Sequence, residues 1–426
     1  MKVRGLAAAA GLALSVLLLG QAQASTERQA RYTVRDLGNL GGTITAAADV
    51  NALGQVVGFS MTTDGFLHAF LWSKGKMTDL GTLGGQSSYA TGINDAGVVV
   101  GYSQLAGSQD SHAFLWRKGR GMRDLGTLGG AQSFATDVND LGLVVGRAFD
   151  ATQTPHGFAW TAARGMRQLA GDPFSTAGAA GAGADGPIAG SAGLPLVPGV
   201  WKSSQGAFSA FPLPAGFDQG QTYGLDAGGD AVGTIGTGSG LARGFFRRTG
   251  SAAQAFGAPG QIQNSEAYAV NNARRTVGIA YNDPFGASYG WLARSPGGRM
   301  QLLADLTKSP GWSFNSPAAI NDLGLIAGTG QKDGLPSGFL LTPDRSEQAA
   351  SLRAFALGGR SFHTKVTRTL NGALADLSRA HKRRACTSLA GLATAATHEG
   401  TLSKPVRGIF AADVRGFRRG LGCPGA

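Results

Sequence analysis

The sequence predicts an all-β fold, a seven-bladed β-propeller of four-stranded blades closed by the N-terminal strand, followed by a small C-terminal α-helical domain. Three observations support this. A marker of two apolar residues and a glycine recurs seven times, each clear copy contains four strand-like runs, and the segment before the first copy supplies a strand that the last copy lacks. Glycine accounts for 69 of 426 residues, which suits short strands joined by tight turns.

The chain begins with the features of an export signal. Lys2 and Arg4 precede an apolar run over residues 6–19, and the small-x-small sequence AQA ends at Ala24. We expect a signal peptide over residues 1–24, cleaved after Ala24, and a secreted or periplasmic mature protein; a retained N-terminal anchor is the alternative. No other segment reaches the ~18 apolar residues of a membrane span, so we expect no integral membrane span.

Seven copies of the marker set the number of blades. In most units the copy follows a turn that contains Asn or Asp. Every copy ends in a glycine: Gly58, Gly101, Gly146, Gly190, Gly233, Gly278 and Gly328. The steps between these glycines are 43, 45, 44, 43, 45 and 50 residues. A nearly constant period of this length is typical of a repeat architecture.

The first two copies show the four strands of one blade. The runs YATGIN (89–94) and VVVGYS (98–103) flank a short Gly-containing turn of hairpin type. HAFLW (68–72) is a third run, and MTDLG (77–81) is a fourth, which we expect the next Gly-Gly pair to end. Both faces of HAFLW are apolar, as a strand requires when its sheet lies between neighbouring sheets. Four strands in ~44 residues, stacked face to face, form a propeller blade.

The two ends of the repeat region predict a closed ring and not a linear stack. RYTVRDLGNLGG, before the first copy, has the sequence of a fourth strand without its three predecessors. SGFLLTP (337–343), after the last marker, is a third strand without a fourth. Pairing these ends removes the edges that a solenoid would expose. We therefore expect residues 32–37 to complete the seventh blade.

These motifs resemble those of a known family. HAFLW, DLGTLGG and INDAGVVVGYS are similar to the HAF repeat of bacterial extracellular proteins. The resemblance covers residues 31–343, strongly in the first three copies and loosely afterwards, where Arg243, Tyr289 and Ser337 stand in place of His. It implies an extracellular location and a propeller-like architecture more than an activity. Kelch- and WD-type propellers have a similar period, but their full signatures are absent from the sequence.

Residues 344–426 predict a helical domain. Val366, Leu370, Leu374 and Leu377 recur at helical spacing, and IFAADVRGFRRGLGC has the pattern of another helix. RRACTSLAGL and GLGC resemble the FIMAH-type helical domain found at the C-termini of bacterial extracellular proteins. The strong positive charge of this segment departs from that family, which leaves a shared role open.

The same segment carries both cysteines and most of the net charge. In an exported chain, Cys386 and Cys423 are expected to form one disulfide, with two free thiols as the alternative. Residues 346–426 contain 13 Lys and Arg against 4 acids, and the whole chain has a formal charge of +12. Such a surface attracts anionic polymers, lipid headgroups or nucleic acid; a solvated helical surface is the alternative. The candidate contacts are Lys382, Arg383, Arg384, Arg415, Arg418 and Arg419.

Other recurring polar residues are interpreted as structural. His68, His112 and His156 occupy one position of three successive copies, for which we expect packing between blades in preference to metal binding. The Asn-Asp pairs are interpreted as turn formers, since a calcium loop needs a denser series of oxygen ligands. No GxSxG motif and no paired carboxylates stand out. We expect no cofactor and no metal.

Two classes of function follow. The first is a secreted, non-catalytic binding or scaffold propeller, a monomer whose loops or channel recognise a glycan, a peptide or an envelope polymer. The second is an extracellular glycan-active enzyme, a hydrolase or lyase with its site at the channel mouth. The fold does not decide between them. The acids to inspect for the enzyme are Asp172, Asp218, Glu266, Asp283 and Asp333.

Overall fold

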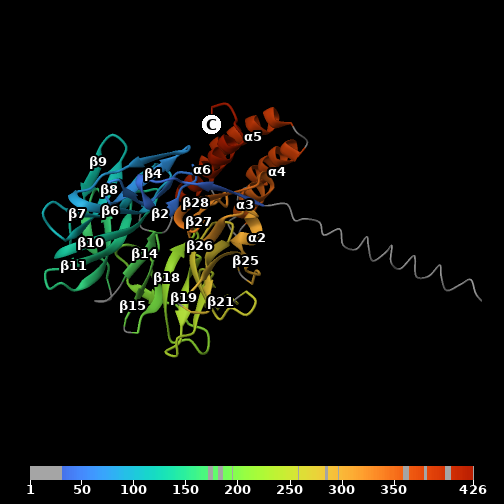
Figure 1. Cartoon of the computed structure of the whole chain (residues 1–426). Coiled ribbons are helices and arrows are strands. Elements are labelled where there is room, and N and C mark those ends of the chain that lie inside the picture. Colours follow the sequence, from blue (N-terminus) through green and yellow to red (C-terminus); the bar gives the residue numbers. More distant parts are fainter. Residues whose placement is uncertain are drawn as a thin grey trace, which may run out of the picture.

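The computed structural model describes residues 31–425 except for short gaps at 171–175, 181–185, 194, 258, 284–285, 296, 358–363, 379–380 and 399–403. The signal peptide expected over residues 1–24 lies outside these residues. Seven four-stranded antiparallel sheets are arranged as the blades of a propeller, with four helices gathered on one side of the ring (Figure 1). The predicted fold class is confirmed. Among the described residues, no helix has the length and apolar character that crossing a bilayer requires.

The first three blades are nearly identical in their strand bounds. Blade 1 comprises β2 (Gly41–Val50), β3 (Val56–Thr62), β4 (Leu67–Ser73) and β5 (Lys76–Asp79). Blade 2 comprises β6 (Gly84–Ile93), β7 (Val99–Leu105), β8 (Ser111–Arg117) and β9 (Gly121–Asp124). Blade 3 comprises β10 (Gly129–Val138), β11 (Val144–Asp150), β12 (Pro155–Thr161) and β13 (Gly165–Gln168).

Blades 4 to 6 have shorter outer strands, and blade 7 takes its outer strand from the start of the repeat region. Blade 4 comprises β14 (Thr176–Ala180), β15 (Ile188–Ala192), β16 (Val197–Trp201) and β17 (Phe208–Ala210). Blade 5 comprises β18 (Gln219–Leu225), β19 (Ala231–Gly236), β20 (Ala242–Arg247) and β21 (Gln254–Ala255). Blade 6 comprises β22 (Asn264–Val270), β23 (Arg275–Tyr281), β24 (Ser288–Arg294) and β25 (Gln301–Leu302), followed by the short helix α2 (Leu303–Thr307). Blade 7 comprises β26 (Trp312–Ile320), β27 (Ile326–Lys332), β28 (Leu335–Pro343) and β1 (Tyr32–Asp36).

The ring closes as predicted, by pairing the two ends of the repeat region. β1 lies antiparallel to β28, with Tyr32 opposite Pro343 and Asp36 opposite Phe339. β1 is thus the outermost strand of blade 7. The first strand of each blade is innermost, since these strands contact one another in succession around the ring and β26 contacts β2.

The marker glycine lies where the first and second strands of a blade approach each other closely. The inner strand β6 has an irregularity between Ala90 and Gly92, and a Cβ atom on Gly101 would overlap the carbonyl oxygen of Tyr89. The equivalent glycines of blades 1, 3, 5 and 6 meet the same obstacle. A bulged inner strand therefore excludes any side chain at this position, which explains why the glycine recurs even where the rest of the motif has changed.

The Gly-Gly pairs differ from the prediction that they end the fourth strand. Gly84 and Gly85 instead begin the inner strand of the next blade. Gly84 has a φ of 100°, and a Cβ atom on Gly85 would lie 2.5 Å from Cβ of Gln104 in β7. The pair therefore lets the chain turn inward and pass close to the end of β7.

The helical domain follows blade 7 directly. It comprises α3 (Arg345–Leu357), α4 (Thr364–Ser378), α5 (Lys382–Thr397) and α6 (Lys404–Gly420). Its apolar core includes Leu389, Phe410 and Phe417 and also Leu323, which belongs to a turn of blade 7. Helices and propeller therefore share a buried cluster and form one packed unit at this face.

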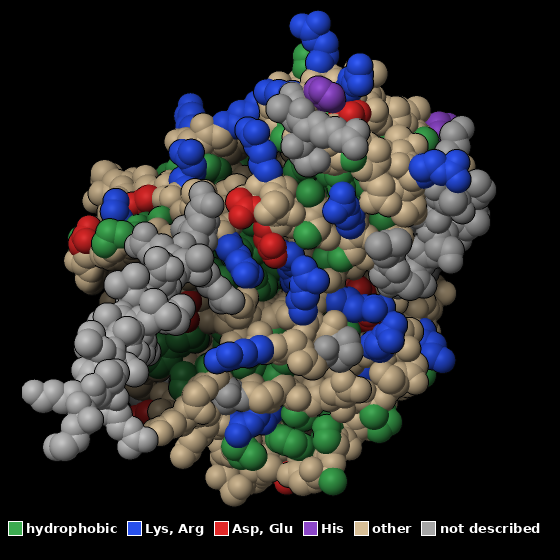
Figure 2. Space-filling view, turned by 90° about the vertical axis from the view of Figure 1, so that its right-hand side faces the viewer, with side chains coloured by type: hydrophobic (Ala, Val, Ile, Leu, Met, Phe, Trp, Pro, Cys, Tyr) green, Lys and Arg blue, Asp and Glu red, His purple; other side chains and the backbone are tan. Residues whose placement is uncertain are grey.

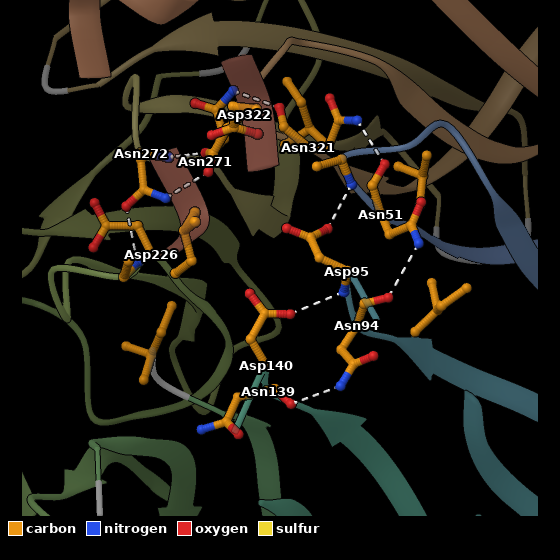
Figure 3. A pocket seen from close by; sticks show the side chains of 18 of the residues that line it. Asn51, Asn94, Asp95, Asn139, Asp140, Asp226, Asn271, Asn272, Asn321 and Asp322 are labelled. Carbon is orange, nitrogen blue, oxygen red and sulfur yellow. Dashed lines mark hydrogen bonds between the residues drawn. The ribbon is translucent and has the colours of Figure 1, made fainter. Parts of the chain in front are cut away.

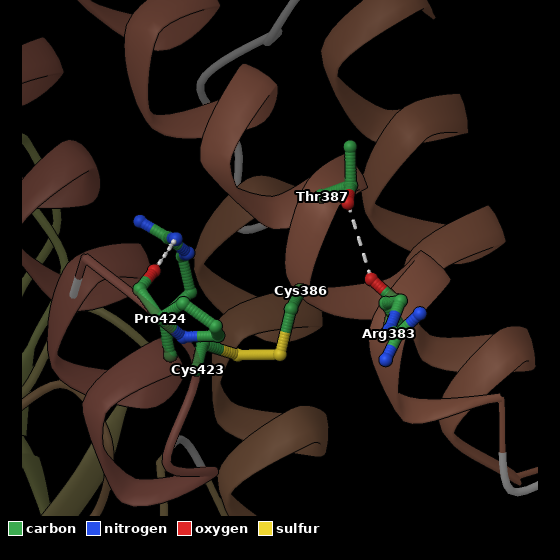
Figure 4. Close-up of a disulfide and its surroundings, with 6 residues drawn as sticks. Arg383, Cys386, Thr387, Cys423 and Pro424 are labelled. Carbon is green, nitrogen blue, oxygen red and sulfur yellow. Dashed lines mark hydrogen bonds between the residues drawn. A yellow bond between two sulfur atoms is a disulfide. The ribbon is translucent and has the colours of Figure 1, made fainter.

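The predicted disulfide is present. Cys386 in α5 and Cys423 after α6 are bonded, with Cα atoms 5.5 Å apart (Figure 4). The bond joins the start of α5 to the end of α6, two segments that the sequence separates by 37 positions. It thereby brings the basic residues at these two helix ends close to each other.

Candidate functional site

One face of the propeller is formed by the turns between the first and second strands of the blades, and we call it the turn face. Each of the described turns begins with an Asn, or with Asp226 in blade 5, and this side chain caps its own turn. In blade 2, Oδ1 of Asn94 accepts a hydrogen bond from the Val98 N–H at 2.9 Å. Asn94 is buried. The Asn residues thus act as the turn formers that the sequence predicts.

The same Asn side chains also join neighbouring blades. Nδ2 of Asn51 donates to the carbonyl oxygen of Asn94 at 3.1 Å, and Asn94 donates in turn to Asn139 at 3.0 Å (Figure 3). Asn271 donates to Asn321 at 2.8 Å, and Asn321 donates to Asn51 at 2.9 Å, across the closure of the ring. This is a ladder of amides that repeats from blade to blade around the channel. The fixed spacing of the Asn residues is a signal for it, but the sequence does not say which groups they meet.

A second set of polar side chains follows the Asn residues. Oδ1 of Asp95 accepts from the Ala52 N–H at 2.8 Å, and Oδ1 of Asp140 accepts from the Asp95 N–H at 2.8 Å. In blades 6 and 7, Oδ1 of Asp322 accepts from the N–H of Asn272 at 2.6 Å. Asn272 itself accepts from the Ala227 N–H of blade 5 at 3.0 Å. Carboxylates and an amide therefore fill the same role in this second ring.

Helix α6 lies over the centre of the turn face. A cavity of about 200 Å³ lies between the ring turns and α6, and Ile409 and Asp413 line it from the helix. Gly416 packs on the backbone of Ala52 so closely that a Cβ atom would overlap the Ala52 carbonyl oxygen. The helix is therefore seated directly on the ring at the turn-face end of the channel.

Five carboxyl groups line this cavity: Asp95, Asp140, Asp226 and Asp322 of the ring and Asp413 of α6. Asp226, Asp322 and Asp413 are buried, Asp95 is half-buried and Asp140 is exposed. Burial, together with the neighbouring Asp140, raises the pKa of Asp95 to about 7. Burial also raises the pKa of Asp140 and of Asp322, and it raises that of Asp413 well above the usual range, with the Asp322 and Asp95 carboxylates adding to the effect.

Two further acids lie on the inner strands next to the ring. The carboxylate of Asp49 accepts hydrogen bonds from the N–H groups of Val50 and Ile93, at 2.7 and 2.8 Å. Burial, and then the neighbouring Asp137, raise its pKa to about 7 despite these bonds. In the part of the chain that the structure describes, no three His, Cys, Asp or Glu side chains are grouped as a metal ion would need.

The opposite face carries the connections between blades, and we call it the loop face. On this face His68 and His112 pair with carboxylates of their own blades, a contact that the expected packing between blades did not include. Their Nδ1 atoms lie 2.8 Å from the carboxylates of Asp79 and Asp124. His156 is buried and lies 3.0 Å from Asp150. The His and Asp of the HAF and DLG motifs thus form one paired unit in each of the first two blades, which sequence spacing did not indicate.

A row of aromatic side chains runs across the first and second strands of blades 1 to 3. Tyr89 and Tyr102 stack at 4.9 Å between ring centroids, and Phe59 and Phe134 meet them edge-on at 5.1 Å on either side. All four rings are partly exposed. Arg147 extends the row, since its guanidinium lies 5.5 Å from the centroid of Phe134. We call Phe59, Tyr89, Tyr102 and Phe134 the aromatic row.

The structure describes four of the five acids proposed for an enzyme. Of these four, only Glu266 lies on an inner strand. It accepts a hydrogen bond from the hydroxyl of Tyr281 at 2.9 Å, and it raises the pKa values of Tyr268 and Tyr281 beyond the effect of burial. Asp218, Asp283 and Asp333 are exposed and lie in separate loops or turns. Asp172 lies outside the described residues, so the five acids do not form one described cluster.

The six basic candidates divide by exposure. Lys382, Arg383, Arg384 and Arg415 are exposed, and Arg419 is partly exposed. Arg418 is buried and donates to the carbonyl oxygen of Pro424 at 3.0 Å (Figure 4), so its guanidinium serves the fold. In Figure 2, Lys and Arg side chains are spread over the face shown, with few acidic side chains among them.

No protein-family model and no curated protein matches this chain. Solved structures match at low identity. The β-propeller domain of the Trilobed protease from Pyrococcus furiosus is 9% identical, with a TM-score of 0.47 over 70% of this chain and 95% of that chain. A gluconolactonase from Xanthomonas campestris is 11% identical, with a TM-score of 0.37 over 74% and 90%. The Aleuria aurantia lectin is 11% identical, with a TM-score of 0.33 over 64% and 94%. The resemblances to the HAF repeat and the FIMAH-type domain therefore stay predictions.

Proposed function

We propose that this chain is an extracellular, non-catalytic binding protein of the HAF-repeat type. Residues 25–343 form the recognition propeller, and residues 344–426 form a basic domain related to the FIMAH type. Residues 1–24 serve as the export signal. The disulfide supports a location outside the cytoplasm, because such bonds persist in oxidising compartments.

The aromatic row carries the proposal that the propeller binds a glycan or a protein segment. Ligand sites are lined mainly by apolar and aromatic side chains with a few polar groups, and Tyr supplies both a flat apolar ring and a hydroxyl. Helix α6 is seated on the turn-face end of the channel, so a ligand would approach from the loop face. The row therefore has the right chemistry for stacking against a sugar ring or an extended peptide.

The basic domain would add binding to anionic envelope polymers. Lys382, Arg383 and Arg384 are exposed in the first turn of α5, where positive charge opposes the helix dipole. Such an arrangement costs stability, which supports a role in binding rather than in folding. Arg415 and Arg419 are further candidates, whereas the burial of Arg418 removes it from the proposed surface.

One observation favours the alternative, a glycan-active enzyme. Glu266 contacts Tyr281 on the inner part of blade 6, as a general acid or base held by a hydroxyl would. Glycoside hydrolysis commonly uses a pair of carboxyl groups on either side of the scissile bond. The enzyme hypothesis therefore requires a second acid, and Asp172 is the candidate outside the described residues.

The test is a pull-down of the full chain on envelope polysaccharides and on DNA, at low and high salt. The variant K382Q/R383Q/R384Q should lose the salt-sensitive part of binding, and Y89A/Y102A should lose the salt-resistant part. The variant K74Q/K76Q/K118Q removes three exposed charges from the propeller and is the control for net charge. Equal loss in both triple variants would contradict a specific basic surface. If the chain turns over a polysaccharide and E266Q abolishes that turnover, the result would favour the enzyme hypothesis.

A further inference from the structure

The contact between α6 and the turn face brings together carboxyl groups from two parts of the chain. Asp413 is 1% exposed and lines the cavity of about 200 Å³ opposite Asp95, Asp140 and Asp322. Its Oδ2 atom has no hydrogen-bond partner among the described residues. A buried carboxylate without a partner is strongly unfavourable, because its ionised form loses hydration that nothing replaces.

The ring itself does not need these carboxyl groups to be acids. Asn272 occupies the same position in blade 6 and accepts the same kind of backbone hydrogen bond, from Ala227 at 3.0 Å. An amide therefore satisfies the geometry of the ring without charge. Three of the described blades nevertheless carry an Asp there, and α6 adds a fourth acid at the centre. This arrangement would be destabilising if all four groups were ionised.

We propose that α6 is a pH-dependent plug of the channel, held on the turn face while the carboxyl cluster of Asp95, Asp140, Asp322 and Asp413 is partly protonated, and released when the cluster ionises. A proton between Asp413 and Asp322 allows a hydrogen bond from one carboxyl to the other. When that proton is lost, two carboxylates face each other in a buried cavity. The resulting repulsion favours separation of the helix from the ring.

The charged groups around the cluster set the direction of the effect. From the ring the cluster contains Asp95, Asp140 and Asp322 and shares its cavity with the buried Asp226 of blade 5, and from α6 it meets Asp413 and Arg415. Arg415 lowers the pKa of Asp95, but this is a smaller effect than burial and the charge of Asp140. Arg415 is also exposed, so solvent screens it. The acids therefore dominate. On the inner strand, Asp49 adds a further carboxyl that interacts with Asp95.

The sign follows from linkage. Burial in the docked state raises the pKa of Asp413 well above its ordinary value of 3.8, so docked α6 binds more protons than released α6. Docking is thus strongest below about pH 4 and weakens as the pH rises through the docked pKa of Asp413. The equilibrium between docked and released helix shifts by up to about tenfold per pH unit for each proton released.

The test is hydrogen exchange of the α6 amides in the full chain between pH 5 and pH 8.5, corrected for the intrinsic pH dependence of exchange. We expect the opening equilibrium of α6 to rise at least tenfold across this range while the inner strands stay protected. In D413N the amide can still donate to Asp322, so protection should persist at high pH. D64N, which changes an exposed acid in the β3–β4 loop, should behave as the unchanged chain.

Three results would overturn the proposal. One is an α6 opening equilibrium that does not change with pH, and another is the same pH slope in D413N as in the unchanged chain. The third is recovery of protection at pH 8.5 on adding calcium chloride, which would make the cluster a cation site instead. If D413N fails to fold, D95N replaces it, because Asn272 already serves at the equivalent ring position; D95N should reduce the slope.

Discussion

A buried ion pair joins blade 6 to the helical domain, and it allows a quantitative prediction. Arg275, the first residue of β23, is 2% exposed and pairs with Glu347 of α3, which is 22% exposed. The hydroxyl of Tyr32 in β1 lies beside the same guanidinium, and burial raises the pKa of Tyr32 to about 12. One guanidinium thus contacts blade 6, the closing strand and the first helix.

We predict that Glu347→Gln destabilises the chain by about 3 kcal/mol. Removing one partner of a buried ion pair leaves an uncompensated charge and costs roughly 3–5 kcal/mol. The lower end applies because Glu347 keeps part of its exposure to water. Adding Arg275→Met should recover most of the loss, since an apolar side chain of similar length removes the buried charge.

The measurement is denaturant unfolding of the full chain followed by tryptophan fluorescence and by far-UV circular dichroism. The matched control is Lys332→Gln, which breaks the exposed pair between Lys332 and Asp36, 3.0 Å apart, that also joins β1 to the last blade. Exposed pairs contribute about 0–1 kcal/mol, so this variant should change little. A Glu347→Gln effect no larger than that of the control, or a double variant less stable than the single, would refute the reasoning.

Two further predictions concern the blades and the helices. Gly101→Ala should destabilise the propeller by at least about 2 kcal/mol, because the added methyl group meets the Tyr89 carbonyl oxygen. Gly372→Ala, at an exposed position of α4, should stabilise the chain by about 0.5–1 kcal/mol. Thermal unfolding compares the two variants, and equal effects would argue against the close approach. Replacing Cys386 and Cys423 by Ser should lower the free energy of unfolding by about 3–4 kcal/mol, because the disulfide closes a loop of 37 residues. Hydrogen exchange should then rise in α5 and α6 before it rises in the blades. A uniform rise in hydrogen exchange would contradict this local effect.

The blade count and the ring closure were predictable because their signals are local. The glycine at 101 and the turn at Asn94 fix one blade by short-range sterics and hydrogen bonds, and repetition multiplies the evidence. The extra strand at residues 32–36 was predictable because it has the sequence of a known position in the repeat. The disulfide was predictable from the number of cysteines and from the compartment that the sequence led us to expect, since two cysteines have one simple pairing outside the cytoplasm.

The contacts across blades could not be predicted in the same way. Asn94 meets the carbonyl of Asn139 only because two turns 45 residues apart face each other, and no sequence pattern encodes that distance. The pairing of His68 with Asp79 was missed because strand register decides it. Asp413 carried one weak signal, a lone acid between Ala412 and Val414 on the apolar side of a basic helix, but its partners come from distant turns.

Closing the ring with the first strand affects how the chain can be made. β1 is synthesised before any blade, yet its partner β28 is the last strand of the propeller. At roughly 5–20 residues per second, translation of the intervening chain takes on the order of half a minute. During that time a nascent chain has two unsatisfied edges and can pair with other copies. A chaperone that shields residues 32–36 until the final blade emerges would therefore determine the yield of folded protein.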